Sequence, residues 1–330
     1  MTPYRTWLKI FFATAIAIPI LAAAADILLQ RGLGLRQVPL DPDMERKVFS
    51  LIVAPKASPA VIVAGDSRAE RHVVPAVIEE RLKTSAVNVA VSSGEMISVA
   101  KTFDRYDILA DKPILILSAT SFQYNNGAID HDSLSMDSVV EMPWIQQIQV
   151  CREKLPELAY RKIRMYLELG KKKKLLKDYP EKGFVGVDTV LSATLDQLSG
   201  IGLEPGKTRH PWYKDLRPGQ PKAIILADAI DRLAQSGCPI VLFTPPVSPV
   251  FREYIKGTWI DQYEREYSAF LKRTADRHSN IHFLDFYQNW TDEFPNDQFY
   301  DIQHLNRTGA QKLTAILCDR IAEWRLLKSN

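Results

Sequence analysis

A serine and a histidine near opposite ends of this chain are of the residue types that acyl-transfer chemistry needs. Ser67 follows an apolar run ending in Gly65-Asp66 and precedes a stretch of helical character. At such a turn a serine stands at a helix N-terminus, where free backbone N–H groups and the helix dipole favour developing negative charge. His304 follows Asp301 by three residues, so the carboxylate can hold the imidazole in one tautomer. The pattern predicts a Ser–His–Asp site with Ser67 as nucleophile.

Each of these residues also has a structural interpretation. Gly-Asp-Ser is a common turn whose polar side chains often cap a helix. His304 can begin a helix, and Asp301 can cap that same helix. The combination favours chemistry, because the strand before Ser67 and the spacing of the second pair both match what a nucleophile and its base require.

The two blocks, together with Leu305-Asn306 and Gly309-Ala310, resemble the SGNH (GDSL-like) hydrolase superfamily. In that superfamily Ser, His and Asp act together in ester hydrolysis or acyl transfer. The resemblance covers residues 60–125 and 220–320. It is nearest to the membrane-anchored branch whose members O-acylate cell-surface polymers, as in alginate acetylation and teichoic-acid alanylation.

Two further blocks of the family supply the oxyanion hole. The second places a glycine after a strand, and Gly94 fits that place. The third usually contains an asparagine, which this chain lacks at the expected spot, and Thr120, Ser121 and Asn125 are the candidates for the side-chain donor. We take the expected donors to be Ser67, Gly94 and Thr120. Losing one such donor typically costs about a hundred- to a thousandfold in rate.

Strands and helices are expected to alternate along the chain. Strands are expected at 61–64, 87–91, 113–117, 239–243 and 281–284. Helices are expected at 74–83, 98–109, 221–236, 259–277 and 309–326. The strands are continuously apolar, as strands buried on both faces are. We therefore expect a three-layer, flavodoxin-like α/β fold with helices on both faces of a parallel sheet, and the candidate residues at the carboxyl ends of its strands.

Residues 1–30 are expected to form a membrane anchor or a signal segment. An uncharged run extends from Ile10 to Ala25 and reaches about 20 residues if Asp26 is tolerated near an interface, which is the length that spans hydrocarbon. Residues 22–25 also suit a signal-peptidase site. We expect a single N-terminal apolar helix in the bacterial inner membrane with the catalytic domain in the periplasm. Secretion after signal cleavage is the alternative.

The rest of the chain divides into a connector at 31–59, with a short helix near 45–52, and an SGNH-like domain at 60–330. A largely helical insertion is expected at about 127–220. It is rich in basic residues, which can attract anionic lipid headgroups or an acidic polymer, or can simply solvate a helix face. These residues are Arg161, Lys162, Arg164, Lys171, Lys172, Lys173, Lys174 and Lys177.

Composition and cysteine spacing exclude several other classes of function. The chain has 330 residues, a net charge of +3 and no basic stripe interleaved with aromatics, so a nucleic-acid partner is not expected. Cys151, Cys238 and Cys318 are too far apart for a zinc or redox motif; we expect small buried hydrophobes, with at most one pair bridged. His131 between two aspartates is a poor metal site. No cofactor or metal is expected.

The chemistry expected is that of a serine-dependent carboxylic-ester hydrolase or O-acyl(acetyl)transferase. It would use Ser67, His304 and Asp301 on a cell-surface polysaccharide or glycan. Partners would be an acylated donor, a glycan and a multispanning membrane acyltransferase. The alternative is a catalytically weak or inactive SGNH-fold protein for binding or assembly in polysaccharide modification or export, which the missing third-block asparagine favours.

Overall fold

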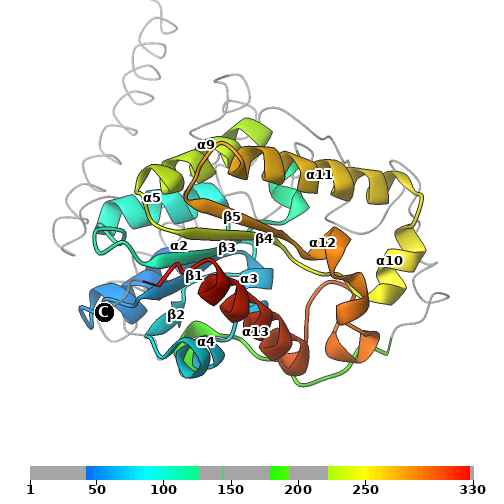
Figure 1. Cartoon of the computed structure of the whole chain (residues 1–330), viewed down its shortest axis with the longest axis horizontal. Coiled ribbons are helices and arrows are strands. Elements are labelled where there is room, and N and C mark those ends of the chain that lie inside the picture. Colours follow the sequence, from blue (N-terminus) through cyan, green and yellow to red (C-terminus); the bar gives the residue numbers. More distant parts are fainter. Residues whose placement is uncertain (1–41, 126–143, 145–178, 193–221, 328–330) are drawn as a thin grey trace, which may run out of the picture.

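The computed structural model describes residues 42–125, 144, 179–192 and 222–327 (Figure 1). The predicted apolar N-terminal helix and most of the predicted insertion lie outside the described residues. Within the described ranges, no helix combines the length and the apolar character that a membrane crossing requires.

Five parallel strands form one sheet in the order β2-β1-β3-β4-β5 (Figure 1). They are β1 (Val61–Gly65), β2 (Ala86–Asn88), β3 (Ile114–Ser118), β4 (Ile240–Thr244) and β5 (Ile281–Asp285). This is the strand order of flavodoxin-like sheets. The predicted α/β fold with a parallel sheet is confirmed.

Alternate residues of β1 enter different hydrophobic clusters, which explains why the strand is apolar throughout. Ile62 and Ala64 belong to one cluster, and Val61 and Val63 belong to the other. Successive side chains of a strand point to opposite faces, so a sheet covered on both sides tolerates no polar alternation.

Helices cover both faces of the sheet (Figure 1). Buried side chains of α2, α5, α9 and α11 form the cluster on one face, and those of α3, α4 and α13 contribute to the cluster on the other. The helices are α2 (Pro42–Val48), α3 (Ser67–His72), α4 (Pro75–Leu82), α5 (Met96–Tyr106), α9 (Lys222–Gln235), α10 (Pro249–Ile255), α11 (Trp259–Ala275), α12 (Phe286–Asn289) and α13 (Arg307–Glu323). Shorter turns are η1 (Phe49–Val53), η2 (Ser121–Tyr124), η5 (Pro180–Gly183), η6 (Thr291–Glu293) and η7 (Asn296–Gln298).

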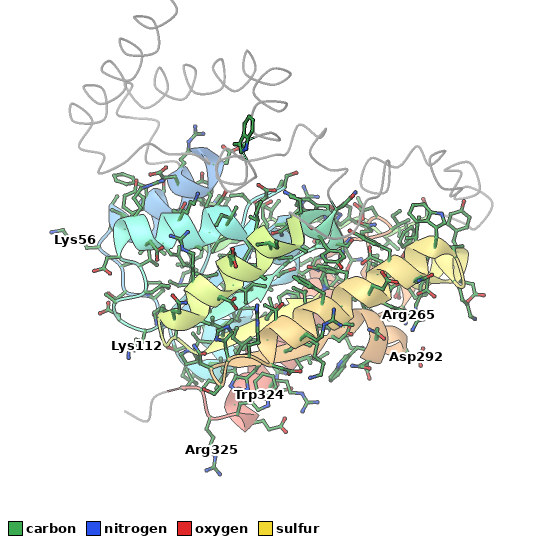
Figure 2. All side chains as sticks on the ribbon, turned by 90° about the horizontal axis from the view of Figure 1, so that it is seen from above. Lys56, Lys112, Arg265, Asp292, Trp324 and Arg325 are labelled. Atoms are coloured by element: carbon green, nitrogen blue, oxygen red, sulfur yellow. The ribbon has the colours of Figure 1, made fainter. Side chains whose placement is uncertain are left out.

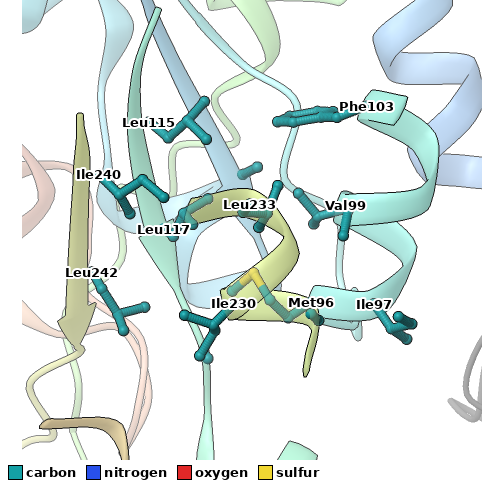
Figure 3. Packing of buried hydrophobic residues seen from close by; sticks show 14 of the residues in the cluster. Met96, Ile97, Val99, Phe103, Leu115, Leu117, Ile230, Leu233, Ile240 and Leu242 are labelled. Atoms are coloured by element: carbon teal, nitrogen blue, oxygen red, sulfur yellow. The ribbon is translucent and has the colours of Figure 1, made fainter. Parts of the chain in front are cut away.

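The first face is packed by interdigitating helix and strand side chains. Figure 3 shows Leu117 of β3 and Leu242 of β4 on the side of the sheet that faces Met96 of α5 and Ile230 of α9. Seen from above, α5, α9 and α11 lie side by side over the sheet, with α9 between the other two (Figure 2). This continuous apolar layer fixes where α5 begins, and therefore where the loop before it lies.

Several segments differ from their prediction in extent; the strand expected at 87–91, for instance, covers only Ala86–Asn88. Residues 42–53, expected as a connector with a short helix, pack into the core, because Met44 and Val48 are fully buried. The expected helix at 74–83 is preceded by a separate helix, α3, because Val73 and Val74 are extended and Pro75 begins α4. The helices α10 and α12 were not predicted.

Part of the predicted insertion, residues 179–192, packs along the second face of the domain. The N–H of Val185 donates to Glu70 O of α3 at 3.2 Å, and the N–H of Arg307 donates to Val187 O at 2.8 Å. Phe184, just before Val185, is buried in the core cluster. This segment is therefore hydrogen-bonded both to α3, the helix after β1, and to the start of α13.

Candidate active site

The turn after β1 places Ser67 at the first position of α3. Gly65 has φ +130°, and a Cβ there would lie 2.2 Å from Ser118 O, so only glycine fits. Asp66 caps the helix, since its Oδ1 accepts the Arg68 N–H at 3.0 Å. The first N–H groups of a helix have no intrahelical acceptor. The predicted strand-to-helix presentation of Ser67 is therefore what the structure contains.

The structure brings Ser67, His304 and Asp301 into one hydrogen-bonded chain. Ser67 Oγ lies 2.9 Å from His304 Nε2, although 237 positions separate the two residues. His304 Nδ1 lies 2.8 and 3.1 Å from the two carboxylate oxygens of Asp301. With the proton on Nδ1 donated to Asp301, Nε2 is free to accept the serine proton.

Asp301 is held in place by the backbone of its own loop. Its Oδ1 accepts the N–H groups of Gln303 and His304 at 2.8 and 2.7 Å. Burial is the largest influence on the pKa of Asp301 and raises it. The hydrogen bond and charge of His304 and the two backbone N–H groups together outweigh burial, so the pKa is held below its usual value. Asp301 is therefore an ionised partner for the imidazole.

Aromatic and basic residues surround the imidazole of His304. The ring of Tyr300 stacks on it, with centroids 5.5 Å apart and an interplanar angle of 17°. Arg71 of α3 donates a hydrogen bond to the Tyr300 hydroxyl and lies over its ring. Because Arg71 is one helical turn after Ser67, the nucleophile and the base are linked by a second set of contacts.

His72 lies fully buried behind the base. Its Nε2 accepts the N–H of Leu305 at 3.0 Å, and its ring centroid is 6.0 Å from that of His304. Burial, followed by the charges of His304, Arg68 and Arg71, lowers the pKa of His72 well below its usual value, so this side chain is neutral. Sequence reasoning missed His72 and Tyr300, because neither stands at an informative spacing from a partner.

Gly94 lies beside the nucleophile turn, as predicted, but its N–H is already engaged. A Cβ on Gly94 would lie 2.4 Å from Gly65 O, so the two turns touch through their backbones. The Gly94 N–H donates to Val91 O at 2.9 Å. An oxyanion bound there would have to replace this acceptor.

The three side-chain donors considered for the third block have separate environments. The Thr120 hydroxyl is buried and makes no hydrogen bond of normal geometry among the described residues, yet it is close enough to stabilise the Asp66 carboxylate. Ser121 donates to Glu264 Oε1 at 2.6 Å. Asn125 is buried at the end of η2. Burial raises the pKa of Asp66, opposed chiefly by Arg68 and then by Thr120.

Gln123 is the side chain that joins the blocks, and sequence reasoning missed it. Its Oε1 accepts the Met96 N–H at 2.8 Å. Its Nε2 lies 3.4 Å from Gly94 O and 3.5 Å from Asp66 Oδ2. The available signal was a side-chain amide soon after β3. Here the amide ties the Gly94 turn to the nucleophile turn.

The described residues also show the surroundings of candidate metal ligands and of two cysteines. It contains no group of three or more His, Cys, Asp or Glu side chains that could hold a metal ion. Cys238 and Cys318 are buried, as predicted. Cys151 and His131 lie outside the described residues.

Comparison with known proteins adds likenesses of fold. A protein-family model matches residues 221–325, which is less than half of the chain but includes β4 through α13 with Asp301 and His304. No curated protein matches the sequence.

Several solved structures are similar. A putative platelet activating factor from Streptococcus pneumonia is 13% identical, with a TM-score of 0.42, over 91% of this chain and 99% of that chain. A lipase/acylhydrolase from Enterococcus faecalis is 13% identical, with a TM-score of 0.39, over 82% and 98%. A catalytic mutant of an acetylxylan esterase from Geobacillus stearothermophilus is 14% identical, with a TM-score of 0.39, over 83% and 98%. With TM-scores below 0.5 and identities below 25%, these likenesses carry no argument about the activity of this chain.

Proposed function

We propose that this protein is an SGNH-type serine esterase or O-acyl(acetyl)transferase that acts on a cell-surface polysaccharide or glycan. The observation that carries the proposal is the hydrogen-bonded series from Ser67 Oγ through His304 to Asp301, with distances of 2.9 and 2.8 Å. Such geometry is what activation of a serine by a general base requires.

In the proposed reaction, Ser67 Oγ attacks the acyl carbonyl while His304 Nε2 takes the hydroxyl proton. Asp301 stays ionised and stabilises the imidazolium, consistent with its lowered pKa. The imidazolium then protonates the leaving alkoxide, and an acyl ester remains on Ser67. Water or a sugar hydroxyl, deprotonated by His304, releases the acyl group as a free acid or as a new ester.

The N–H groups of Ser67 and Gly94 are the proposed donors to the oxyanion. The first stands at the start of α3, where the helix dipole also favours negative charge. The second reaches the oxyanion when it leaves Val91 O. Catalytic hydrogen bonds often form fully only in the complex with substrate, so this exchange is compatible with activity. We assign the Thr120 hydroxyl a minor part, because it is buried beside Asp66.

The polymer substrate and the location of the protein are proposals from sequence. The apolar run at 10–25 supports a single N-terminal pass through the bacterial inner membrane with a periplasmic domain, or secretion after cleavage. The basic run near 161–177 supports an acidic polymer or anionic membrane nearby. A multispanning membrane acyltransferase would supply acyl groups to such a domain.

A second candidate is a binding or assembly protein that keeps the fold without turnover. The observation that favours it is the engaged Gly94 N–H together with the lack of a third-block asparagine. Such a protein would hold the polymer or dock on the acyltransferase.

Acetyl-ester turnover by the full-length protein, measured with and without a polysaccharide acceptor, separates these candidates. We expect hydrolysis or transfer by the wild type, and a loss of about a thousandfold or more in Ser67→Ala and His304→Ala. Acetylated polymer that accumulates only with acceptor would indicate transfer. Full biological function in both variants would instead support the binding protein.

A further inference from the structure

The loop that carries Gly94 is a strained connection between β2 and α5. Ser93 adopts φ +59°, in the left-handed region that side chains other than glycine rarely occupy. The next residue, Gly94, is in backbone contact with Gly65. A residue held in this region is strained, so surrounding contacts must keep the loop in place.

A buried lysine from α2 holds the first half of this loop. Lys47 is only 2% exposed, and its Nζ lies 3.0 Å from Glu70 Oε1 and 2.6 Å from Ala90 O. The second oxygen of Glu70 accepts a hydrogen bond from Ser92 Oγ at 2.9 Å. Lys47 therefore contacts the chain just before the loop directly and reaches Ser92 through Glu70 of α3.

A second buried lysine holds the other end of the loop. Lys222, the first residue of α9, forms an ion pair with Glu95, and both side chains are under 5% exposed. Glu95 immediately follows Gly94 and occupies the N-cap position of α5. The two lysines thus act on the residues that flank Ser93 and Gly94, from two different helices on the same face of the sheet.

We propose that Lys47 and Lys222 are positioning residues that clamp the loop 92–95 and so hold the Gly94 N–H in register with Ser67. This inference rests on the proposed function, because it concerns the oxyanion side of that site. Buried ion pairs often contribute little net stability, since desolvation of both charges offsets their attraction. Here one pair includes Glu95 of the loop, and the other is hydrogen-bonded to Ser92 through Glu70, so both bear on the placement of one short loop beside the nucleophile.

The protein contains a matched control for this proposal. Arg105 and Glu45 form a third buried pair at 2.9 Å, with side chains 4% and 5% exposed. This pair joins α5 to α2, the helix that also carries Lys47. Among the described residues, no contact of Arg105 with the loop 92–95 is found. Removing the cation here should cost stability of a similar kind without moving Gly94.

The test compares Lys47→Met, Lys222→Met and Arg105→Met in the full-length protein, with 4-nitrophenyl acetate as substrate. All three are assayed below the lowest melting temperature of the set. We expect kcat to fall about tenfold or more in the two lysine variants with KM changed less than twofold, since small misplacements of a catalytic group can cost up to about a hundredfold. We expect Arg105→Met to keep the wild-type kcat.

Milder variants keep the proposal falsifiable if the lysine variants do not fold. Ser92→Ala removes one hydrogen bond at the surface, and Glu70→Gln weakens the link to Lys47; we expect each to lower kcat a few-fold at unchanged KM. Equal kcat losses in the lysine and Arg105 variants, or wild-type kcat in the milder pair, would overturn the clamp. A wild-type protein without turnover would overturn the proposed function, and the catalytic role of the clamp with it.

Discussion

The general-base side and the oxyanion side of this site are built differently. On the base side, Ser67, His304 and Asp301 already make the contacts that catalysis needs, and short-range bonds within the loop 301–304 hold them. On the oxyanion side, the Gly94 N–H is bonded to Val91 O, and contacts from distant helices hold the loop. The groups for proton transfer are therefore already in contact, whereas stabilisation of the oxyanion depends on a loop whose N–H donor must change its acceptor.

Removing the negative charge of Asp301, which orients His304, should cause the largest loss of activity. In Asp301→Asn the loop can keep its backbone hydrogen bonds, but the amide no longer stabilises the imidazolium. We expect kcat/KM for acetyl-ester hydrolysis to fall on the order of a thousand- to ten-thousandfold. Asp297→Asn, an exposed carboxylate four residues earlier, is the control and should retain activity. Comparable activity in the two variants would mean that the base side is not prepared for catalysis.

Adding one methyl group to Gly94 is the equivalent test on the oxyanion side. The new Cβ would lie 2.4 Å from Gly65 O, so Gly94→Ala must displace the loop from the nucleophile turn. We expect kcat to fall roughly a hundred- to a thousandfold, the usual cost of one lost oxyanion donor. As a control, Gly257→Ala strains a residue with φ +71° remote from these turns and should lower the melting temperature only. An active Gly94→Ala enzyme would remove Gly94 from the site.

Thr120 sharpens the assignment of the oxyanion donors. Its hydroxyl is buried beside Asp66, so we expect Thr120→Val to reduce kcat less than about tenfold. Asp66 should then show a further raised pKa, because the hydroxyl that favours its ionised form is gone. A loss of a hundredfold or more in kcat would instead place Thr120 in the oxyanion hole.

His72 contributes a smaller effect, on stability rather than rate. Its folded-state pKa lies well below the ordinary value of 6.5, so below about pH 6.5 the unfolded chain binds a proton that the folded protein does not. Stability therefore falls as the pH decreases, with a slope that approaches about 1.4 kcal/mol per pH unit for this group.

The variant His72→Gln keeps an acceptor for the Leu305 N–H and removes the titration. Denaturant unfolding between pH 5 and 8 should show a shallower acid limb for the variant than for the wild type. Parallel curves would mean that His72 is not held neutral in the folded protein.

The strands and the base side were accessible from sequence because their signals are local. The β1, β3 and β4 strands are buried throughout, and a continuous apolar run marks them to within about one residue. Asp301 and His304 are three residues apart, so the spacing alone predicts that they pair. The start of α10 also has a sequence signal, because Ser248 followed by Pro249 is typical of a helix N-terminus, and Ser248 Oγ does accept the Phe251 N–H. The helix α12 is too short for a periodic pattern.

The oxyanion side was less accessible because its contacts are long-range. Lys222 and Glu95 are 127 positions apart, and Lys47 and Ala90 are 43 apart. Gln123 reaches the Gly94 turn from a different strand end. No pattern of residue types along the chain distinguishes these buried partners from ordinary surface charges and amides, because only the packing of α2 and α9 on the sheet brings them together.

The most direct test of the central claim is covalent trapping of the nucleophile in the full-length protein with a fluorophosphonate probe, followed by peptide mapping. We expect one phosphonyl group per chain, on Ser67, with no labelling of Ser67→Ala and labelling slowed at least a hundredfold in His304→Ala. A folded wild-type protein that stays unlabelled, or that is labelled at another serine, would contradict the claim.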